Sequence, residues 1–506
     1  MFHPKRNILI LLVCLLLALP ALTLADGHGN TLIMARAVDA TGLDPHTQTA
    51  FASFALLGMI YEPLITLDRD LNLTPALAES WSFSEDGLAL TMNLRSGVTF
   101  HDGSAFDAED VIASYERILD EETGSAARTN YLSIVSMDAP DEHTVVFNLD
   151  KPDVPLLSAM STINASILSS DVISMGDPAV DIIGTGPFAL DSWVADETTQ
   201  LSANEAWWGG EIAIDGIEIR IIPEETSIIA AMRAGNVHFA MINDPLVATL
   251  VEGEDDVQIT TIPTLSYNGI QLRAAREPLE HLEARQAISC AINRQEILDT
   301  ASLGQGIITG PLTMASYALP VSELFCYEQD VEKARELLAA AGLQDGFTLD
   351  IMVAVAEPPT ALSIAQIVQS QLAEVNITVE IESLEFSTYV DRWLAADFMG
   401  AVVLNSGFTD PYPMYARYWQ EGAIFQDVAG YLDDTLDGLM KAGQIETDPD
   451  VRYEIFRQFQ LHLAETVPWI WLYTNFTYTA QLPSVIGWNP GSNRSLKFLA
   501  DVSLSS

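Results

Sequence analysis

The stretch from Phe347 to Ile381 most constrains the fold of this chain of 506 residues. Apolar and polar residues alternate from Phe347 to Val355 and again from Ile377 to Ile381, which predicts two strands. Between them, the apolar residues of 360–375 recur at helical spacing. Neighbouring parallel strands need such a crossover helix, so the stretch predicts a parallel βαβ unit and an α/β fold.

Residues 75–119 form a second compact unit of two strands and a helix. The polar turn Ser84–Gly87 separates two segments of strand pattern, which predicts a hairpin. Asp107 can cap a helix over residues 108–119, whose apolar positions fall on one face. Nothing in this unit is arranged for catalysis.

The same unit resembles the segment that identifies the peptide/nickel-type (family 5) solute-binding proteins of ABC importers. The matching residues are Pro75, Leu77, Ala78, Ser80, Trp81, Asp86, Gly87, Leu94 to Val98, Phe100 to Gly103, Ala108, Asp110, Val111 and Ser114. The resemblance continues at Gly184–Phe188, Asn204–Gly210 and Glu283–Leu298, and it covers nearly the whole chain after residue 25. It implies a periplasmic-binding-protein fold of type II.

That fold implies two lobes, with an extra subdomain in the first lobe. We expect the main subdomain of lobe I to comprise residues 26–67, 186–262 and 474–506, and the extra subdomain residues 68–185. Lobe II is expected over residues 263–473. The chain is then expected to cross between the lobes near Ile262–Gln271 and Leu472–Gln481.

The first 25 residues have the pattern of a cleavable secretory signal peptide. Lys5 and Arg6 precede an apolar run from Ile8 to Leu19, and cleavage is expected near Ala25. Cys14 lies inside the run, so we assign it to the removed peptide. No later stretch reaches the ~20 apolar residues of a membrane helix, which predicts a periplasmic protein that is not embedded in the membrane.

Two cysteines, Cys290 and Cys326, remain after that cleavage. An even pair in an oxidising compartment is a candidate disulfide. Two buried thiols are the alternative.

The net charge of −47 narrows the possible partners. Such a surface repels nucleic acid and anionic lipid, so no nucleic-acid partner is expected. The acidic residues are spread along the chain rather than gathered in a tail, which favours a solvated surface over a dedicated cation site.

No enzyme motif is found in the sequence. The G-x-S-x-G, H-E-x-x-H and S-x-x-K patterns are absent, and the eight histidines are scattered. Gly304, Gly306 and Gly310 follow no strand that would support a dinucleotide site. We therefore expect no catalytic residue, no metal, no cofactor and no enzymatic activity.

The resemblance implies the substrate-binding component of an ABC importer. Such a protein captures a peptide or peptide-like small polar solute between two lobes and presents it, as a monomer, to the permease subunits in the membrane. A binding protein of this family for a sugar-like, cationic or metal-chelate solute is the alternative. A secreted hydrolase and a periplasmic sensor partner are further ones.

The resemblance also guides the choice of site residues. In the dipeptide-binding members, an arginine in the loop after the first strand of the second lobe grips the peptide carboxylate. The matching loop here, residues 356–359, has no arginine and carries Glu357, which would repel a carboxylate. We expect a peptide-like or other small polar solute that bears a cation or many hydroxyls, held by Thr41, Glu357, Phe386, Asn405, Asp410 and Tyr412. Structural roles for these residues remain open, as does the choice between packing and ligand contact for Trp207 and Trp208.

Overall fold

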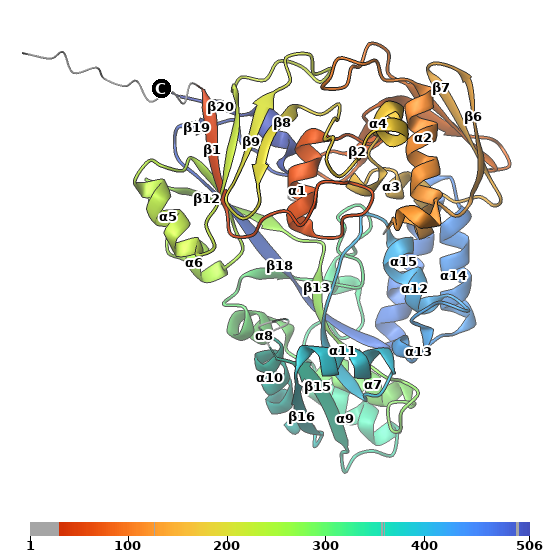
Figure 1. Cartoon of the computed structure of the whole chain (residues 1–506). Helices are drawn as coiled ribbons and strands as arrows, with labels where there is room; N and C mark the ends of the chain where they lie inside the picture. The colour runs from red at the N-terminus through yellow and green to blue at the C-terminus, as the bar shows by residue number, and fades with distance from the viewer. Residues whose placement is uncertain (1–29, 126, 356–357, 359, 492–494, 506) are drawn as a thin grey trace, which may run out of the picture.

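The computed structural model describes residues 30–125, 127–355, 358, 360–491 and 495–505. The predicted signal peptide, including Cys14, and the predicted site residue Glu357 lie outside these ranges. Figure 1 shows two lobes, one above the other, with the N-terminal half in the upper lobe and the green and cyan segments in the lower one. Within the described ranges, no helix has the length and apolar character needed to cross a membrane.

A mixed sheet of twelve strands runs through both lobes, in the order β16-β15-β17-β13-β18-β11-β1-β10-β9-β8, with β12 and β14 also paired to β18. The strands of the upper half are β1 (Thr31–Arg36), β8 (Phe188–Val194), β9 (Thr198–Ala203), β10 (Gly216–Ile221), β11 (Phe239–Ile242) and β12 (Gln258–Pro263). Those of the lower half are β13 (Tyr267–Leu272), β14 (Gly306–Ile308), β15 (Thr348–Ala354), β16 (Thr378–Leu384) and β17 (Gly400–Asn405).

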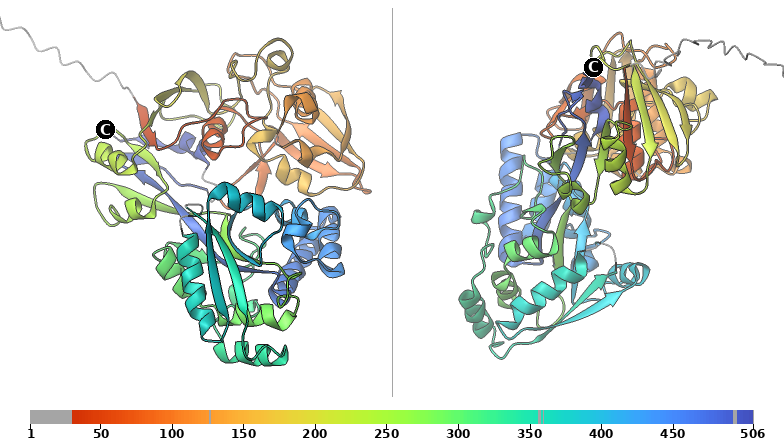
Figure 2. Two further views of the ribbon diagram at one scale, coloured as in Figure 1. Left: turned by 60° about the horizontal axis from the view of Figure 1, so that its bottom comes forward. Right: turned by 90° about the vertical axis from the view of Figure 1, so that its left-hand side faces the viewer.

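Strand β18 (Trp469–Gln481) joins the two halves. Its C-terminal end pairs with β11 and β12, and its N-terminal end pairs with β13. Both views of Figure 2 show this dark blue strand running from one lobe into the other. The chain also passes between the halves at residues 264–266, between β12 and β13, and both passages fall where crossings are predicted.

The upper lobe contains a second sheet, in the order β4-β5-β7-β6. Its strands are β4 (Ala78–Phe83), β5 (Ala89–Leu94), β6 (Ile134–Asp141) and β7 (Thr144–Leu149), and helix α2 (Ala108–Leu119) packs on it. The hairpin β4-β5 and the Asp107 cap of α2 are as the sequence predicts. This sheet lies inside the expected subdomain 68–185, whose exact bounds stay a prediction.

Shorter elements complete the upper lobe. They are α1 (Phe51–Ile60), β2 (Ile65–Leu67), β3 (Leu73–Pro75), α3 (Pro155–Ala159), α4 (Ser170–Met175), α5 (Glu225–Arg233), α6 (Pro245–Thr249), β19 (Val485–Ile486), β20 (Ser503–Leu504) and the 3₁₀ turn η5 (Leu496–Asp501), which packs against α1. The segment 496–502 has a strand-like pattern of apolar residues, yet residues 496–501 form η5, which Ser495 caps.

The lower lobe contains the predicted βαβ unit, with β15 and β16 parallel in register and α10 between them. Its helices are α7 (Leu282–Ala291), α8 (Arg294–Ala301), α9 (Val331–Ala340), α10 (Ala361–Ala373), α11 (Phe386–Leu394), α12 (Pro411–Trp419), α13 (Gln426–Ala429), α14 (Asp434–Ile445) and α15 (Pro449–Thr466). The segment 283–298 has the apolar stripe of a single helix, yet it forms two helices, because Asn293 interrupts it and caps α8.

A disulfide joins Cys290, in α7, to Cys326, with Cα atoms 4.7 Å apart. It ties the start of lobe II to the segment that precedes α9. The hydrophobic cluster around Cys290 contains residues of α7, α10, β15 and β18, so the bond lies against the main core of the lower lobe.

Candidate functional site

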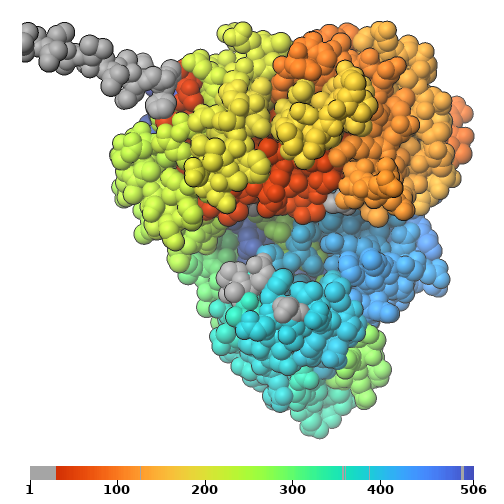
Figure 3. All heavy atoms as spheres, viewed as in Figure 1, coloured from red at the N-terminus to blue at the C-terminus, as the bar shows by residue number. Residues whose placement is uncertain are grey.

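A hollow separates the two lobes on the face shown in Figure 3. The red segment that follows β1 forms its upper edge, the cyan lobe II its lower edge, and dark blue β18 is visible at its floor. The carboxyl ends of β1 and β17 both deliver loops to this region, which is where α/β sheets bind ligands.

Thr41 lies in the loop after β1 and is exposed. Its backbone N–H donates to Ser53 Oγ at 2.9 Å, and its hydroxyl lies 3.0 Å from Gln48 Oε1 and 3.2 Å from Ser53 Oγ. The loop therefore holds Thr41 in place and leaves it exposed.

A buried polar cluster anchors the same loop to the extra subdomain. Arg117 of α2 donates to both oxygens of Asp44, at 2.5 and 3.0 Å, and to His46 Nδ1 at 2.9 Å. His46 Nε2 donates to the carbonyl of Ser166 at 2.9 Å, which fixes the tautomer because Nδ1 must accept. Burial, together with the charge of Arg117, lowers the pKa of His46 to about 4, so the ring is neutral at pH 7.

Three predicted residues lie on the lobe II side. Asn405 ends β17 and its Nδ2 donates to the hydroxyl of Tyr267 at 3.0 Å. Phe386 begins α11 and is 50 % exposed, and Figure 1 shows α11 at the edge of lobe II that faces lobe I. Tyr412 is half-buried in α12 and donates its hydroxyl to Gln420 at 3.0 Å. Each of these polar groups already has one protein partner.

Asp410 is placed differently from the other predicted residues, because it is buried. Its two oxygens accept from the guanidinium of Arg452 at 2.7 and 2.8 Å, and Oδ1 also caps α12 by accepting from the N–H of Tyr412. Arg452 is equally buried and donates at 2.8 Å to the hydroxyl of Tyr317. This arrangement gives Asp410 the structural role that the sequence left open.

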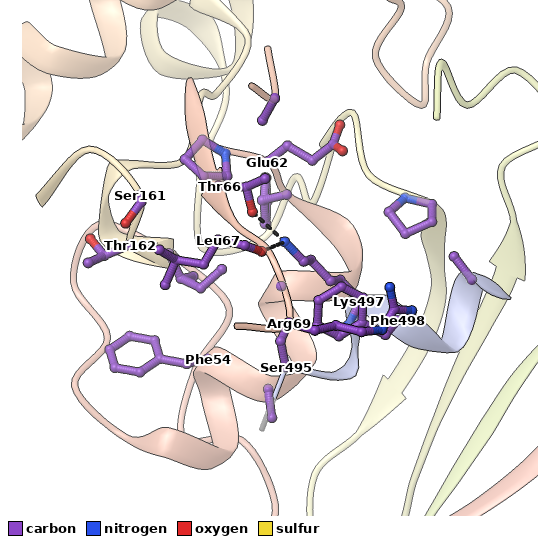
Figure 4. Close-up of a pocket in the computed structure, with 18 of the residues that line it drawn as sticks. Phe54, Glu62, Thr66, Leu67, Arg69, Ser161, Thr162, Ser495, Lys497 and Phe498 are labelled. Carbon is purple, nitrogen blue, oxygen red and sulfur yellow. Dashed lines mark hydrogen bonds between the residues drawn. The ribbon is translucent and has the colours of Figure 1, made fainter. Parts of the chain in front are cut away.

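A cavity of about 380 Å³ lies beside the cleft, mainly in lobe I (Figure 4). Residues of α1, of the segment 61–69, of the loop 161–163 and of η5 line it, and Thr409 contributes from the lobe II loop after β17. The volume falls within the range of ~300–1,000 Å³ that is usual for small-molecule sites. The cavity is therefore lined by residues of both lobes.

Glu62 is the half-buried acid of this cavity. Its carboxylate accepts from Trp208 Nε1 at 2.7 Å, from the Thr185 hydroxyl at 2.9 Å and from Trp207 Nε1 at 3.2 Å. Burial raises the pKa of Glu62 to about 7, and the hydrogen bonds from Trp208, Thr185 and Trp207 oppose part of that rise. Both tryptophans thus pack inside the lobe and also line the cavity. Arg95 lies over Trp208, with Cζ 4.1 Å from the ring centroid.

Lys497 is the half-buried cation of the cavity. Its ammonium group donates to the carbonyl of Leu67 at 2.7 Å and to the hydroxyl of Thr66, and it lies 5.0 Å from the centroid of the Phe498 ring. Burial lowers the pKa of Lys497 to about 8, although the charge of Glu62 raises it again at longer range. Among the residues that the structure describes, Lys497 forms no ion pair with a carboxylate.

Sequence reasoning singled out neither Glu62 nor Lys497 as a site residue. Glu62 follows Tyr61 in a segment that resembles a strand of the family, but its partners stand more than 120 positions away. No group of three or more histidine, cysteine, aspartate or glutamate side chains suited to a metal ion is found among residues 30–125, 127–355, 358, 360–491 and 495–505.

Comparisons with known proteins agree with this architecture. Residues 72–426 match the model of the bacterial extracellular solute-binding proteins, family 5 (middle region). The chain is 25 % identical to the dipeptide-binding protein of Escherichia coli K12, covering 89 % of this chain and 91 % of that protein. It is 26 % identical to heme-binding protein A of Haemophilus influenzae, covering 92 % and 90 %.

A solved structure supports the fold independently. The periplasmic binding protein DppA of Helicobacter pylori, in complex with the peptide STSA, superposes with a TM-score of 0.72 at 25 % identity, covering 95 % of this chain and 99 % of that one. This confirms the predicted two-lobed fold of type II. The chain belongs to the bacterial extracellular solute-binding proteins of family 5.

Proposed function

We propose that this protein is the extracytoplasmic substrate-binding component of an ABC importer, and that it captures a peptide or peptide-like small polar solute between its lobes. The observation that carries the proposal is the family match over residues 72–426. The relative named as a dipeptide-binding protein, aligned over 91 % of its length, favours a peptide-like solute. The solute-loaded, closed form then docks on the permease subunits.

The location and state of the protein are part of this proposal. Residues 1–25 are removed as a signal peptide, and the mature monomer works in the periplasm without catalysing a reaction. The composition supports this, because a net charge of −47 keeps such a protein soluble and away from anionic lipid.

The proposed ligand contacts are narrower than those the sequence suggests. Thr41 acts from lobe I, and Phe386, Asn405 and Tyr412 act from lobe II, with the Phe386 ring available for stacking. Asp410 is left out, because a carboxylate already held by two bonds from Arg452 gains little from a ligand cation. Glu357 stays a candidate on the strength of the sequence alone.

Binding measured without turnover tests the proposal. The mature chain is titrated by calorimetry with dipeptides, tripeptides, sugars, polyamines and metal chelates. The bound solute is then recovered and identified by mass spectrometry. We expect tight binding of one peptide-like class, recovered intact. Hydrolysis of the recovered solute would overturn the transport assignment, and binding of only sugars or chelates would move the solute class to that alternative.

A matched pair of variants tests the contacts. Asn405→Ala removes an amide from the end of β17, whereas Asn130→Ala removes an exposed amide in the extra subdomain. We expect Asn405→Ala to weaken solute binding about tenfold, as the loss of one hydrogen bond to a ligand does, and Asn130→Ala to leave it unchanged.

A further inference from the structure

The cavity has one apolar part and one cationic part. The apolar part includes Phe54, Ala55, Ile163 and Trp207, and the cationic part includes Lys497 with Thr66 beside it. Figure 4 shows Lys497 reaching from η5 toward Thr66 and Leu67, while Phe54 lies on the far side of the pocket. A ligand that fills this space needs an apolar body and a polar group at one end.

The charges at the polar part favour an anion. Lys497 donates to two partners in the part of the chain that the structure describes, so one of its three N–H groups remains for a ligand. Its ammonium is mostly buried without a paired carboxylate, and an anion supplied by a ligand would offset that cost. Arg69, which lies 4.3 Å over Phe498, adds positive charge, although it is paired with Asp501 at 2.5 Å.

The same arrangement disfavours a cationic ligand. Two carboxylates line the cavity, and both are engaged: Glu62 accepts three hydrogen bonds, and Asp501 is paired with Arg69. A ligand ammonium would meet the repulsion of Lys497 and would have to compete for these acceptors. A ligand carboxylate would instead be attracted by Lys497.

We propose that the cavity is a subsite for an apolar group ending in a carboxylate. The apolar body lies between α1 and Trp207, and the carboxylate accepts a hydrogen bond from Lys497. The inference rests on the proposed function in one respect, namely that this group belongs to the captured solute. Thr409 connects the cavity to the cleft between the lobes, because the loop after β17 that contains Thr409 lies on the lobe II side of that cleft.

Lys497 is also a source of positive charge for a solute carboxylate. The loop at residues 356–359 carries no arginine, so it offers no cation to such a carboxylate. In a protein with a net charge of −47, a carboxylate is held only where the local charge is positive. Lys497 supplies that charge from lobe I.

A probe series on the wild-type protein tests this without any mutation. Octanoate and 3-phenylpropionate are titrated by calorimetry and by tryptophan fluorescence, with octylamine and octanol as cationic and neutral counterparts. We expect the two carboxylates to bind with one-to-one stoichiometry and to change the emission, because Trp207 lines the cavity. Equal affinity for octanoate, octanol and octylamine, or no carboxylate binding at millimolar concentration, would overturn the proposal.

Two lysine variants locate the binding. Lys497→Met should weaken octanoate binding about 10- to 100-fold, the loss expected for a hydrogen bond to a charged group, while Lys441→Met should not change it. Lys441 is exposed on α14 and is paired with Asp437, so the control removes the same charge far from the cavity. Unchanged octanoate binding by folded Lys497→Met protein would refute the role of Lys497.

Competition separates this inference from the proposed function. If the solute found by the binding panel is displaced by octanoate, the cavity is part of the solute site. If solute and octanoate bind independently, the subsite proposal is wrong while the importer assignment stands. If no solute of any class binds but octanoate does, the importer assignment fails and the cavity remains a carboxylate site.

Discussion

Replacement of Asp410 by asparagine tests whether this residue holds the fold or the solute. In the structure, the side chains of Asp410 and Arg452 are 8 % and 6 % exposed, and two hydrogen bonds of 2.7 and 2.8 Å join them. Breaking a buried pair by changing one partner costs about 3–5 kcal/mol, because the other charge is left uncompensated. The Tyr317 hydroxyl and the Gly443 carbonyl still face Arg452, so we expect about 3 kcal/mol for Asp410→Asn.

Asp448 provides the matched control. It caps α15 by accepting from the N–H groups of Asp450 and Val451, and it is exposed. Asparagine and aspartate cap helices about equally well, so Asp448→Asn should change the free energy of unfolding by less than about 0.5 kcal/mol. The difference in unfolding free energy between Asp410→Asn and Asp448→Asn therefore measures the ion pair without the contribution of the helix cap.

Urea unfolding at pH 7, followed by circular dichroism and by tryptophan fluorescence, measures both variants. The double variant Asp410→Asn/Arg452→Met should recover part of the loss, because it removes the unpaired buried charge. An Asp410→Asn protein as stable as the Asp448→Asn protein would refute the structural assignment. If that same variant had also lost solute binding, Asp410 would be a ligand contact after all.

Three further predictions concern stability. Relative to Glu62→Gln, the wild type should lose about 2.5 kcal/mol of unfolding free energy between pH 5 and pH 8. The pKa of Glu62 is raised from 4.5 to about 7, so the folded state keeps a proton that the unfolded state releases in that window. A pH-independent difference in urea midpoints would contradict this. Replacement of Cys290 and Cys326 by alanine should cost about 3–4 kcal/mol, the chain-entropy value for a loop of 36 residues, and an unchanged urea midpoint would argue against it. Gly438→Ala should raise the free energy of unfolding by up to about 1 kcal/mol, because Gly438 lies inside α14 and a methyl group there would meet open space. Gly184→Ala should lower it, because the new methyl group would overlap the carbonyl oxygen of the last residue of α1. Thermal melts that rank the two variants in the opposite order would refute the packing argument.

The local parts of the fold could be predicted because their causes are local in sequence. The βαβ unit follows from an alternation of apolar residues, a helical stripe and a second alternation within 35 positions, and β15, α10 and β16 lie there. The cap of α2 is equally local, since Asp107 needs only the two N–H groups that follow it. The break between α7 and α8 could not be predicted in this way, because the apolar stripe continues through Asn293.

The site could be predicted less well, because its decisive contacts join distant segments. Asp410 reads as a ligand candidate until Arg452, 42 positions away, is placed beside it. Glu62 and its tryptophan partners are about 145 positions apart, and Lys497 lies 430 positions from the carbonyl of Leu67. No periodicity in the sequence encodes such pairings, so the candidate region was chosen only from the chain's resemblance to a family.

The shared strand β18 also sets an order of events as the chain is synthesised. Strand β11 is made early, yet its partner along one edge is the segment 478–481, which is made after all of lobe II. Until then, that edge of the upper sheet lacks this partner and is open to pairing with other chains. The lower lobe needs only the first residues of β18 to close its sheet, so it can finish before the lobe that precedes it in the chain. A nascent chain that stops before residue 469 would leave both lobes without their common strand and exposed to proteases.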